Sequence, residues 1–186
     1  LQILESINGV HIINHRVNTH MAGALIDGMK YAYDCGYEYC ISMDAGLSFN
    51  PDHIVRFVNH NHCDLILCKR VIKYNTPLSR RILSLIANFV YNLSIKSILQ
   101  FLTTKYYSDI SANFRRYSRK SMELILSSNI NSRSYDFMYE SIRIIYKNKL
   151  SISEVPVTYH FSNTSLNKQV IIDCIKSVRK NFFINF

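Results

Sequence analysis

The sequence predicts an α/β fold with a mostly parallel central sheet flanked by helices, and three observations point to it. Short apolar runs alternate with stretches whose apolar residues recur at helical spacing. The chain has 186 residues, which is typical of a single domain. Apolar residues make up 48% of it, enough for a sizeable core. We therefore interpret 1–186 as one domain with two halves, 1–78 and 79–186.

Strands and helices alternate in the first half. Apolar residues at helical spacing predict helices over Asn18–Cys35 and Asp52–Asn59, and Gly36 favours the end of the first. Apolar runs too short for helices predict three strands, the last two buried on both faces: Val10–Ile13, Tyr39–Met43 and Cys63–Cys68.

The second half is richer in helices. Ser79–Leu102 predicts a long apolar helix or a helix pair, and Asp109–Tyr117 a polar loop or a short strand. Alternation over Ser151–Tyr159 predicts a strand, which Pro156 confines to an edge of the sheet. Three further segments predict helices, the last of them basic and amphipathic: Ser118–Ser127, Tyr135–Asn148 and Val170–Phe186.

The net charge indicates the class of partner, and the cysteines and the longest uncharged run bear on redox state and membrane spans. The formal net charge is +9, which favours an anionic partner such as a nucleotide, a lipid phosphate or a membrane surface. No recognition motif supports nucleic-acid binding. The five cysteines have no CxxC spacing, so we interpret all of them as reduced core thiols. The longest uncharged run, Ile82–Ile95, is too short and too polar to span a bilayer.

One carboxylate occupies a position typical of a ligand site. The apolar run Tyr39–Met43 ends at Asp44, and Gly46 then permits a sharp turn. In open α/β sheets, ligands bind beyond the carboxyl ends of the strands. Asp44 could therefore hold a divalent cation or a sugar hydroxyl. The alternative is that Asp44 only caps the turn that follows.

Several segments together resemble the family 2 glycosyltransferases, and within them the synthases of dolichyl- or polyprenyl-phosphate sugars. Each block alone is weak, but seven in order across nearly the whole chain are fairly specific. They are Gly28–Ala32, Met43–Pro51, Asp64–Arg70, Arg80–Ser84, Asp109–Arg115 with Glu140 after it, Glu154–Tyr159 and Lys168.

The resemblance implies a GT-A fold, a nucleotide-sugar donor and an acceptor that is a lipid phosphate or a glycan. It also implies Mg²⁺ or Mn²⁺ at Asp44, because a cation offsets the charge that develops on the departing nucleotide. The family's second acidic ligand falls at Gly46, which offers none. The family's first nucleotide-binding strands have no counterpart, so we expect an incomplete amino-terminal part.

The resemblance also assigns roles to other residues. Asp109 would act as base or orient the acceptor, and Glu140 is a weaker catalytic candidate. Their alternatives are a loop cap for Asp109 and a solvated helix face for Glu140. Basic residues would hold the diphosphate or the lipid phosphate, with ordinary surface charge as the alternative. They are Arg70, Arg80, Arg115 and Lys168.

We thus expect a cytoplasmic glycosyltransferase at the inner face of a membrane, where Val170–Phe186 and Ser79–Leu102 would make peripheral contact with anionic lipid. The alternative is a catalytically inactive glycosyltransferase-like domain that serves as a binding module or scaffold. Metal-dependent binding of a nucleotide sugar would discriminate between the two.

Overall fold

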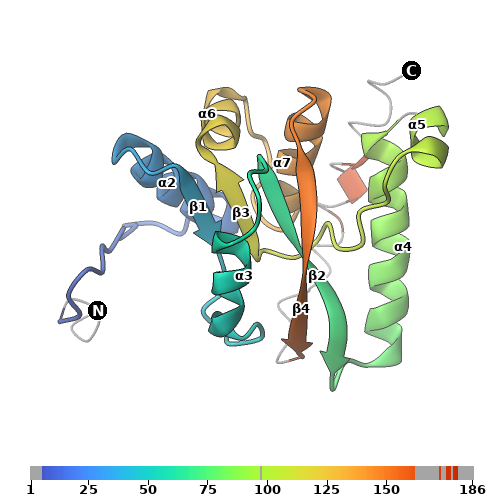
Figure 1. The fold of residues 1–186 in the computed structure, drawn as a ribbon, viewed down its shortest axis with the longest axis horizontal. Coiled ribbons are helices and arrows are strands. Elements are labelled where there is room, and N and C mark those ends of the chain that lie inside the picture. The colour runs from blue at the N-terminus through green and yellow to red at the C-terminus, as the bar shows by residue number, and fades with distance from the viewer. Residues whose placement is uncertain (1–5, 97, 162–171, 173–174, 177, 180–186) are drawn as a thin grey trace.

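A computed structural model describes residues 6–96, 98–161, 172, 175–176 and 178–179. Four strands form one sheet in the order β1-β3-β2-β4, with helices on both faces (Figure 1). The class is thus α/β, as the sequence predicts. The strands are β1 (Tyr39–Ser42), β2 (Leu65–Tyr74), β3 (Arg115–Ser118) and β4 (Ile152–His160).

The prediction of a mostly parallel sheet is not confirmed, because two of the three ladders among the described strands are antiparallel. β3 lies between β1 and β2 and runs against both, while β2 and β4 pair in parallel. The polar sequence of β3 hid its place in the sheet. Its arginines, Arg115 and Arg116, are only 0% and 2% exposed, so residues typical of a loop occupy a central strand.

The helices lie close to their predicted positions. The predicted helix pair is present as α4 and α5, and the Ser118 hydroxyl caps α6 by accepting a hydrogen bond from the Ser121 amide. The expected strand at Val10–Ile13 is wrong, since this segment has no regular structure. The helices are α2 (His20–Asp34), the 3₁₀ turn η1 (Pro51–His53), α3 (Ile54–Val58), α4 (Leu78–Ile95), α5 (Ile98–Thr103), α6 (Arg119–Ser127) and α7 (Asp136–Lys147).

The two faces of the sheet bury separate apolar clusters. Leu65 and Leu67 of β2 point into a cluster with α2, α4, α6 and α7. Ile66 and Cys68 point to the other face, where Phe57 of α3 belongs to the second cluster. This alternation follows from the two-residue repeat of a strand.

The cysteines are divided between the core and the surface. Cys35 is exposed and Cys40 half-buried, so the prediction that every cysteine lies in the core is wrong, although Cys63 and Cys68 are buried. Cys174 lies outside the described residues. The predicted helix Val170–Phe186 also falls largely outside them, and its described residues 172, 175–176 and 178–179 are helical.

Candidate functional site

Asp44 lies just beyond β1 and is fixed to the segment that leads into β3. Its Oδ1 accepts a hydrogen bond of 2.8 Å from Asn113 Nδ2. The Ser42 hydroxyl, at the end of β1, donates to the Asn113 carbonyl at 3.2 Å. The carboxylate is therefore held at the carboxyl end of the sheet, where the sequence places it.

The loop after Asp44 folds over the end of β4. Phe49 forms an isolated bridge with Tyr159, and the His160 amide donates to the Ser48 carbonyl at 2.8 Å. The Thr158 amide donates to Nε2 of His53 at 3.2 Å, which requires an unprotonated ring nitrogen. Burial, with a contribution from the nearby charge of Arg56, lowers the pKa of His53 and so favours that neutral ring.

Arg70 and Asp109 form a buried ion pair at this end of the sheet. Asp109 is 2% exposed, and its Oδ1 accepts from Arg70 Nη2 at 2.6 Å while its Oδ2 accepts from Nε. The guanidinium carbon also lies 5.0 Å from the centroid of the Tyr159 ring. Burial alone would lower the pKa of Arg70, but the charge and hydrogen bonds of Asp109 raise it above its usual range. Arg70 is thus a fixed cation, with 15% of its side chain exposed.

The ladders bring these groups to one end of the sheet. Ser42 of β1 and Leu67 of β2 both lie opposite Arg115, the first residue of β3. Asp44 follows Ser42 and Arg70 follows Leu67 by a few residues, and Asp109 precedes Arg115 by a few residues. The predicted site residues Asp44, Asp109 and Arg70 therefore lie near the same end of the sheet.

Arg115 is not available to a phosphate. Its side chain is completely buried, and its guanidinium donates to the carbonyls of Ala112 and Met138 at 2.9 and 2.8 Å. It also donates to the carbonyl of Ile110. Arg115 thus ties the segment before β3 to α7, which corrects both the phosphate role and the surface-charge alternative.

Glu140 holds the loop that precedes α7. One of its carboxylate oxygens accepts from the Ser132 amide at 3.0 Å and the Asn131 amide at 3.2 Å. Its contacts are those of a loop cap. Arg80 lies half-buried in the first turn of α4, and Lys168 lies outside the described residues.

Asp44 and Asn113 could supply oxygen ligands to a divalent cation. Within the part of the chain that the structure describes, the Asn113 Oδ1 is buried without a hydrogen-bond partner, beside the Asn113 amide nitrogen that contacts Asp44. Among the described residues, no group of three His, Cys, Asp or Glu could hold a metal by itself. Mg²⁺ is often bound by one or two carboxylates plus substrate phosphates, and this arrangement would suit such a site. Sequence reasoning did not single out Asn113, whose only signal is its place in the block Asp109–Arg115.

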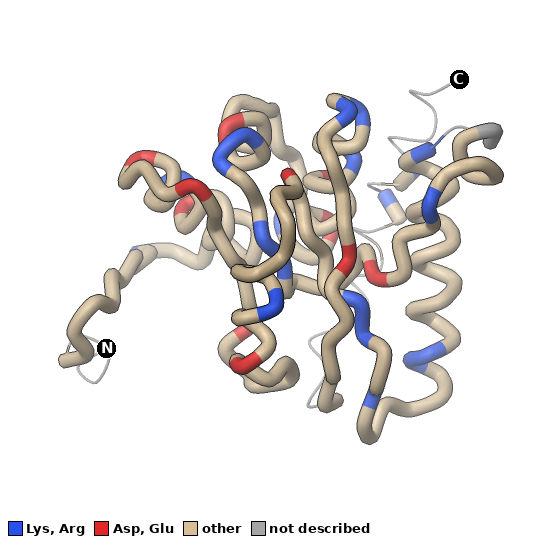
Figure 2. The backbone as a smooth tube through the Cα atoms, viewed as in Figure 1, with Lys and Arg blue, Asp and Glu red and all other residues tan. Residues whose placement is uncertain are grey.

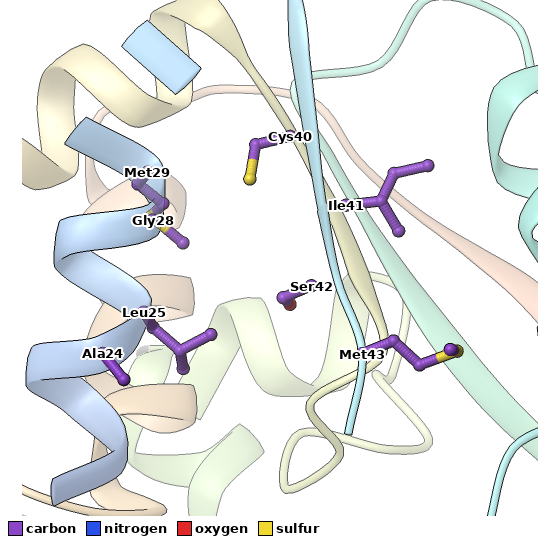
Figure 3. Close-up of a pocket in the computed structure, with 8 residues that line it drawn as sticks. All are labelled: Ala24, Leu25, Gly28, Met29, Cys40, Ile41, Ser42 and Met43. Atoms are coloured by element: carbon purple, nitrogen blue, oxygen red, sulfur yellow. The ribbon is translucent and has the colours of Figure 1, made fainter. Parts of the chain in front are cut away.

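A hollow of about 240 Å³ lies between α2 and β1. Leu25 and Met29 of α2 face Cys40 and Ser42 of β1 across it (Figure 3). Met43, which precedes Asp44 in the chain, is among the residues that line the hollow. Its lining carries no charged group, so any recognition here would rest on apolar contact and the Ser42 hydroxyl.

Curated relatives are glycosyltransferases that act on lipid carriers, as their names state. The chain is 27% identical over 161 residues to UDP-N-acetylglucosamine–dolichyl-phosphate N-acetylglucosaminyltransferase of Methanococcus voltae, covering 83% of this chain and 61% of the relative. It is 27% identical over 156 residues to polyprenol monophosphomannose synthase of Mycolicibacterium smegmatis (81% and 56%). It is 24% identical over 155 residues to undecaprenyl-phosphate mannosyltransferase of Micrococcus luteus (81% and 60%).

These similarities confirm the resemblance to polyprenyl-phosphate sugar transferases at the level of related proteins. No family model matches the chain. The chain spans about three-fifths of the length of the relatives it matches.

Proposed function

We propose that this chain is the sugar-transferring domain of a glycosyltransferase that uses a nucleotide-sugar donor and a polyprenyl phosphate acceptor. The observation that carries the proposal is the convergence of Asp44 with the Arg70–Asp109 pair at one end of the sheet. This convergence occurs in a chain similar to three transferases of that kind.

Asp44 and Asn113 would hold the donor diphosphate through a divalent cation. When bound, the cation supplies charge stabilisation for the departing nucleoside diphosphate. Asp44 would offer its carboxylate, and Asn113 would offer its Oδ1, which has no hydrogen-bond partner among the described residues. Gly46 contributes no ligand, so the diphosphate must complete the coordination.

Arg70 would attract the acceptor phosphate, and Asp109 would hold Arg70 in place. A phosphate monoester carries between one and two negative charges near neutral pH, so it attacks without a general base. Its oxygen forms the bond to the anomeric carbon while the bond from that carbon to the diphosphate breaks, and the electron pair leaves with the nucleotide. Of the two expected roles for Asp109, this chemistry favours orientation over proton abstraction.

The outer face of α4 suits contact with a membrane that contains the acceptor. Leu85, Ile86 and Phe89 are 64%, 56% and 50% exposed on one side of this helix. Basic segments lie at the end of β2 and the start of α4 (Figure 2). Apolar side chains flanked by cations are typical of helices that lie in an anionic interface. Within the described residues, no helix is long and apolar enough to cross a bilayer.

The test is transfer of labelled sugar to a short-chain polyprenyl phosphate by the full-length protein. UDP-N-acetylglucosamine and GDP-mannose would serve as donors, each with and without Mn²⁺. We expect Asp44→Asn to lower transfer roughly 100-fold, because it removes the charged ligand. The matched control is Asp52→Asn, which changes an exposed aspartate in η1.

Two outcomes would contradict the proposal. Equal transfer by the wild type and Asp44→Asn would remove Asp44 from the site. Absence of both transfer and nucleotide-sugar binding in the wild type would favour an inactive binding domain.

A further inference from the structure

Helix α4 turns two amide side chains into the core. Asn88 and Asn92 are one helical turn apart and are 3% and 0% exposed. Buried amides are costly unless all their hydrogen-bonding groups find partners. Their partners therefore show what the inner face of α4 is built to hold.

Both amides bind the backbone of the segment that carries Asp109. Asn88 accepts from the Ile110 amide and donates to the Ser108 carbonyl, each at 2.9 Å. Asn92 accepts from the Tyr107 amide at 2.9 Å and donates to the Tyr107 carbonyl at 2.8 Å. Two side chains thus satisfy four backbone groups, as a neighbouring strand would do.

A third side chain holds the same segment from the sheet. Glu154 of β4, whose side chain is 5% exposed, accepts from the Ser108 amide at 2.6 Å and from the Ser108 hydroxyl at 2.9 Å. Backbone groups on both sides of Asp109 are therefore fixed. Its carboxylate meets Arg70, which is fixed on β2.

We propose that Asn88 and Asn92 are positioning residues that set the place of the Asp109–Arg70 pair by clamping residues 107–110 to α4. The proposal rests on the proposed function for the role of that pair. Without the clamp, the segment could shift away from β2, and Asp109 would no longer orient Arg70. A displacement of about 1 Å in a positioning group can lower a rate on the order of 100-fold.

The chemistry of the amide explains why asparagine stands at both positions. Each site needs a donor and an acceptor on two neighbouring atoms, and the asparagine amide supplies them as its NH₂ and its carbonyl oxygen. Aspartate would keep the acceptor and lose the donor. Alanine would lose both and leave a backbone N–H and a C=O buried without partners.

The experiment compares Asn88→Ala with Ser94→Ala in the full-length protein. Ser94 is a matched control because it is a polar residue on the same helix, 2% exposed, whose hydroxyl donates to the Tyr91 carbonyl. Hydrogen–deuterium exchange of the Ile110 amide reports the clamp directly, without any assay of activity. Steady-state sugar transfer reports kcat and the donor KM separately.

We expect Asn88→Ala to speed exchange at Ile110 at least about tenfold while exchange in β2 stays unchanged. We also expect kcat to fall roughly 10- to 100-fold with little change in donor KM. Ser94→Ala should change neither. If Asn88→Ala does not fold, Asn88→Leu receives the same measurements, since it removes the acceptor for the Ile110 amide and keeps a side chain of similar size.

The outcomes separate this inference from the proposed function. Unchanged exchange at Ile110 would overturn the clamp, whatever the activity. Faster exchange with unchanged kcat, in a protein that Asp44→Asn inactivates, would overturn the positioning role and leave the proposed function standing. A wild type that transfers no sugar would defeat the proposed function and with it the positioning role, and the exchange data would still decide whether the clamp exists.

Discussion

Helices α4 and α7 contribute to the same core cluster in opposite ways. The inner face of α7 is apolar, with Phe137, Met138 and Ile142 fully buried. The inner face of α4 adds Tyr91 and Ile95 to the cluster and also buries the amides of Asn88 and Asn92, while large apolar side chains lie on its outer face. Apolar burial therefore dominates the inner face of α7, whereas α4 combines apolar contacts with hydrogen bonds to the Asp109 segment.

The apolar outer face of α4 is thus distinct from the face that packs into the core. Burying a Leu or Ile side chain is worth about 1.5–3 kcal/mol, so leaving several exposed forgoes much stability. Large exposed apolar patches on a protein usually mark an interaction surface. A helix held from inside by polar contacts can keep its apolar side for a lipid surface.

Truncating a side chain on the inner face of α7 tests most directly whether apolar burial holds this helix. We expect Phe137→Ala to lower the free energy of unfolding by about 3–5 kcal/mol, because it leaves a cavity in the core. Urea denaturation of the variant measures this loss. A loss below about 1 kcal/mol would mean that apolar burial does not orient α7.

The second test concerns the inner face of α4. Asn92→Ala leaves the amide and the carbonyl of Tyr107 without their side-chain partner. We expect a loss of about 2 kcal/mol in the free energy of unfolding, from the desolvation of unpaired groups. The same denaturation series measures it. A variant as stable as the wild type would show that water replaces the amide and that Asn92 does not hold the segment.

The outer face of α4 should matter little for stability and much for lipid contact. We expect the double variant Leu85→Gln with Ile86→Gln to change the free energy of unfolding by less than about 0.5 kcal/mol. Its binding to vesicles of phosphatidylglycerol and phosphatidylcholine should fall several-fold, because apolar area is lost from the interface. Sedimentation with the vesicles measures this, and unchanged binding would move the contact elsewhere.

The smallest effect involves Lys96, which joins the two helices. Its Nζ lies 4.6 Å from the ring centroid of Tyr107 and 5.9 Å from that of Tyr146 on α7. Burial lowers the pKa of Lys96, and the charge of Glu154 partly offsets this. Between its lowered pKa and its ordinary value near 10.5, the unfolded chain binds more protons, so the contribution of Lys96 to stability rises with pH.

The measurement compares the wild type with Lys96→Met by urea denaturation from pH 8 to 10.5. We expect the stability difference to move in favour of the wild type as pH rises. A difference that stays constant or moves the other way would show that burial does not govern the titration of Lys96.

Sequence reasoning was most successful where a periodic apolar pattern decided the structure. The positions of α2, α6 and α7 follow from helical spacing, and Asp44 from the end of an apolar run. It left open whether Asp109–Tyr117 is a loop or a short strand, and it did not predict the central place of β3. The arginines of β3 are buried because they donate hydrogen bonds to carbonyls that only the folded chain brings near. Arg116, for example, donates to the carbonyl of Asn61 at 3.1 Å.

The candidate site was predicted only in part, because apolar patterns indicate where strands end but not how loops fold around the site. Asp44 follows β1 as the apolar pattern indicates, whereas Arg70, expected just after the strand Cys63–Cys68, lies within β2, which continues to Tyr74. The roles of Glu140 and Arg115 depend on the loops that fold around them. Asn88 interrupts an apolar run, and that interruption is the only signal of its contact with the Asp109 segment.

The central place of β3 has a consequence for the order in which the chain folds. β1 and β2 precede β3 by dozens of residues, and among the described strands neither pairs with the other. On the ribosome, both would wait without ladder partners until residues 115–118 emerge, and β2 would wait longer still for β4. Such non-local pairing slows folding and prolongs the exposure of sticky strand edges. We therefore expect the nascent chain to be prone to aggregation during its synthesis.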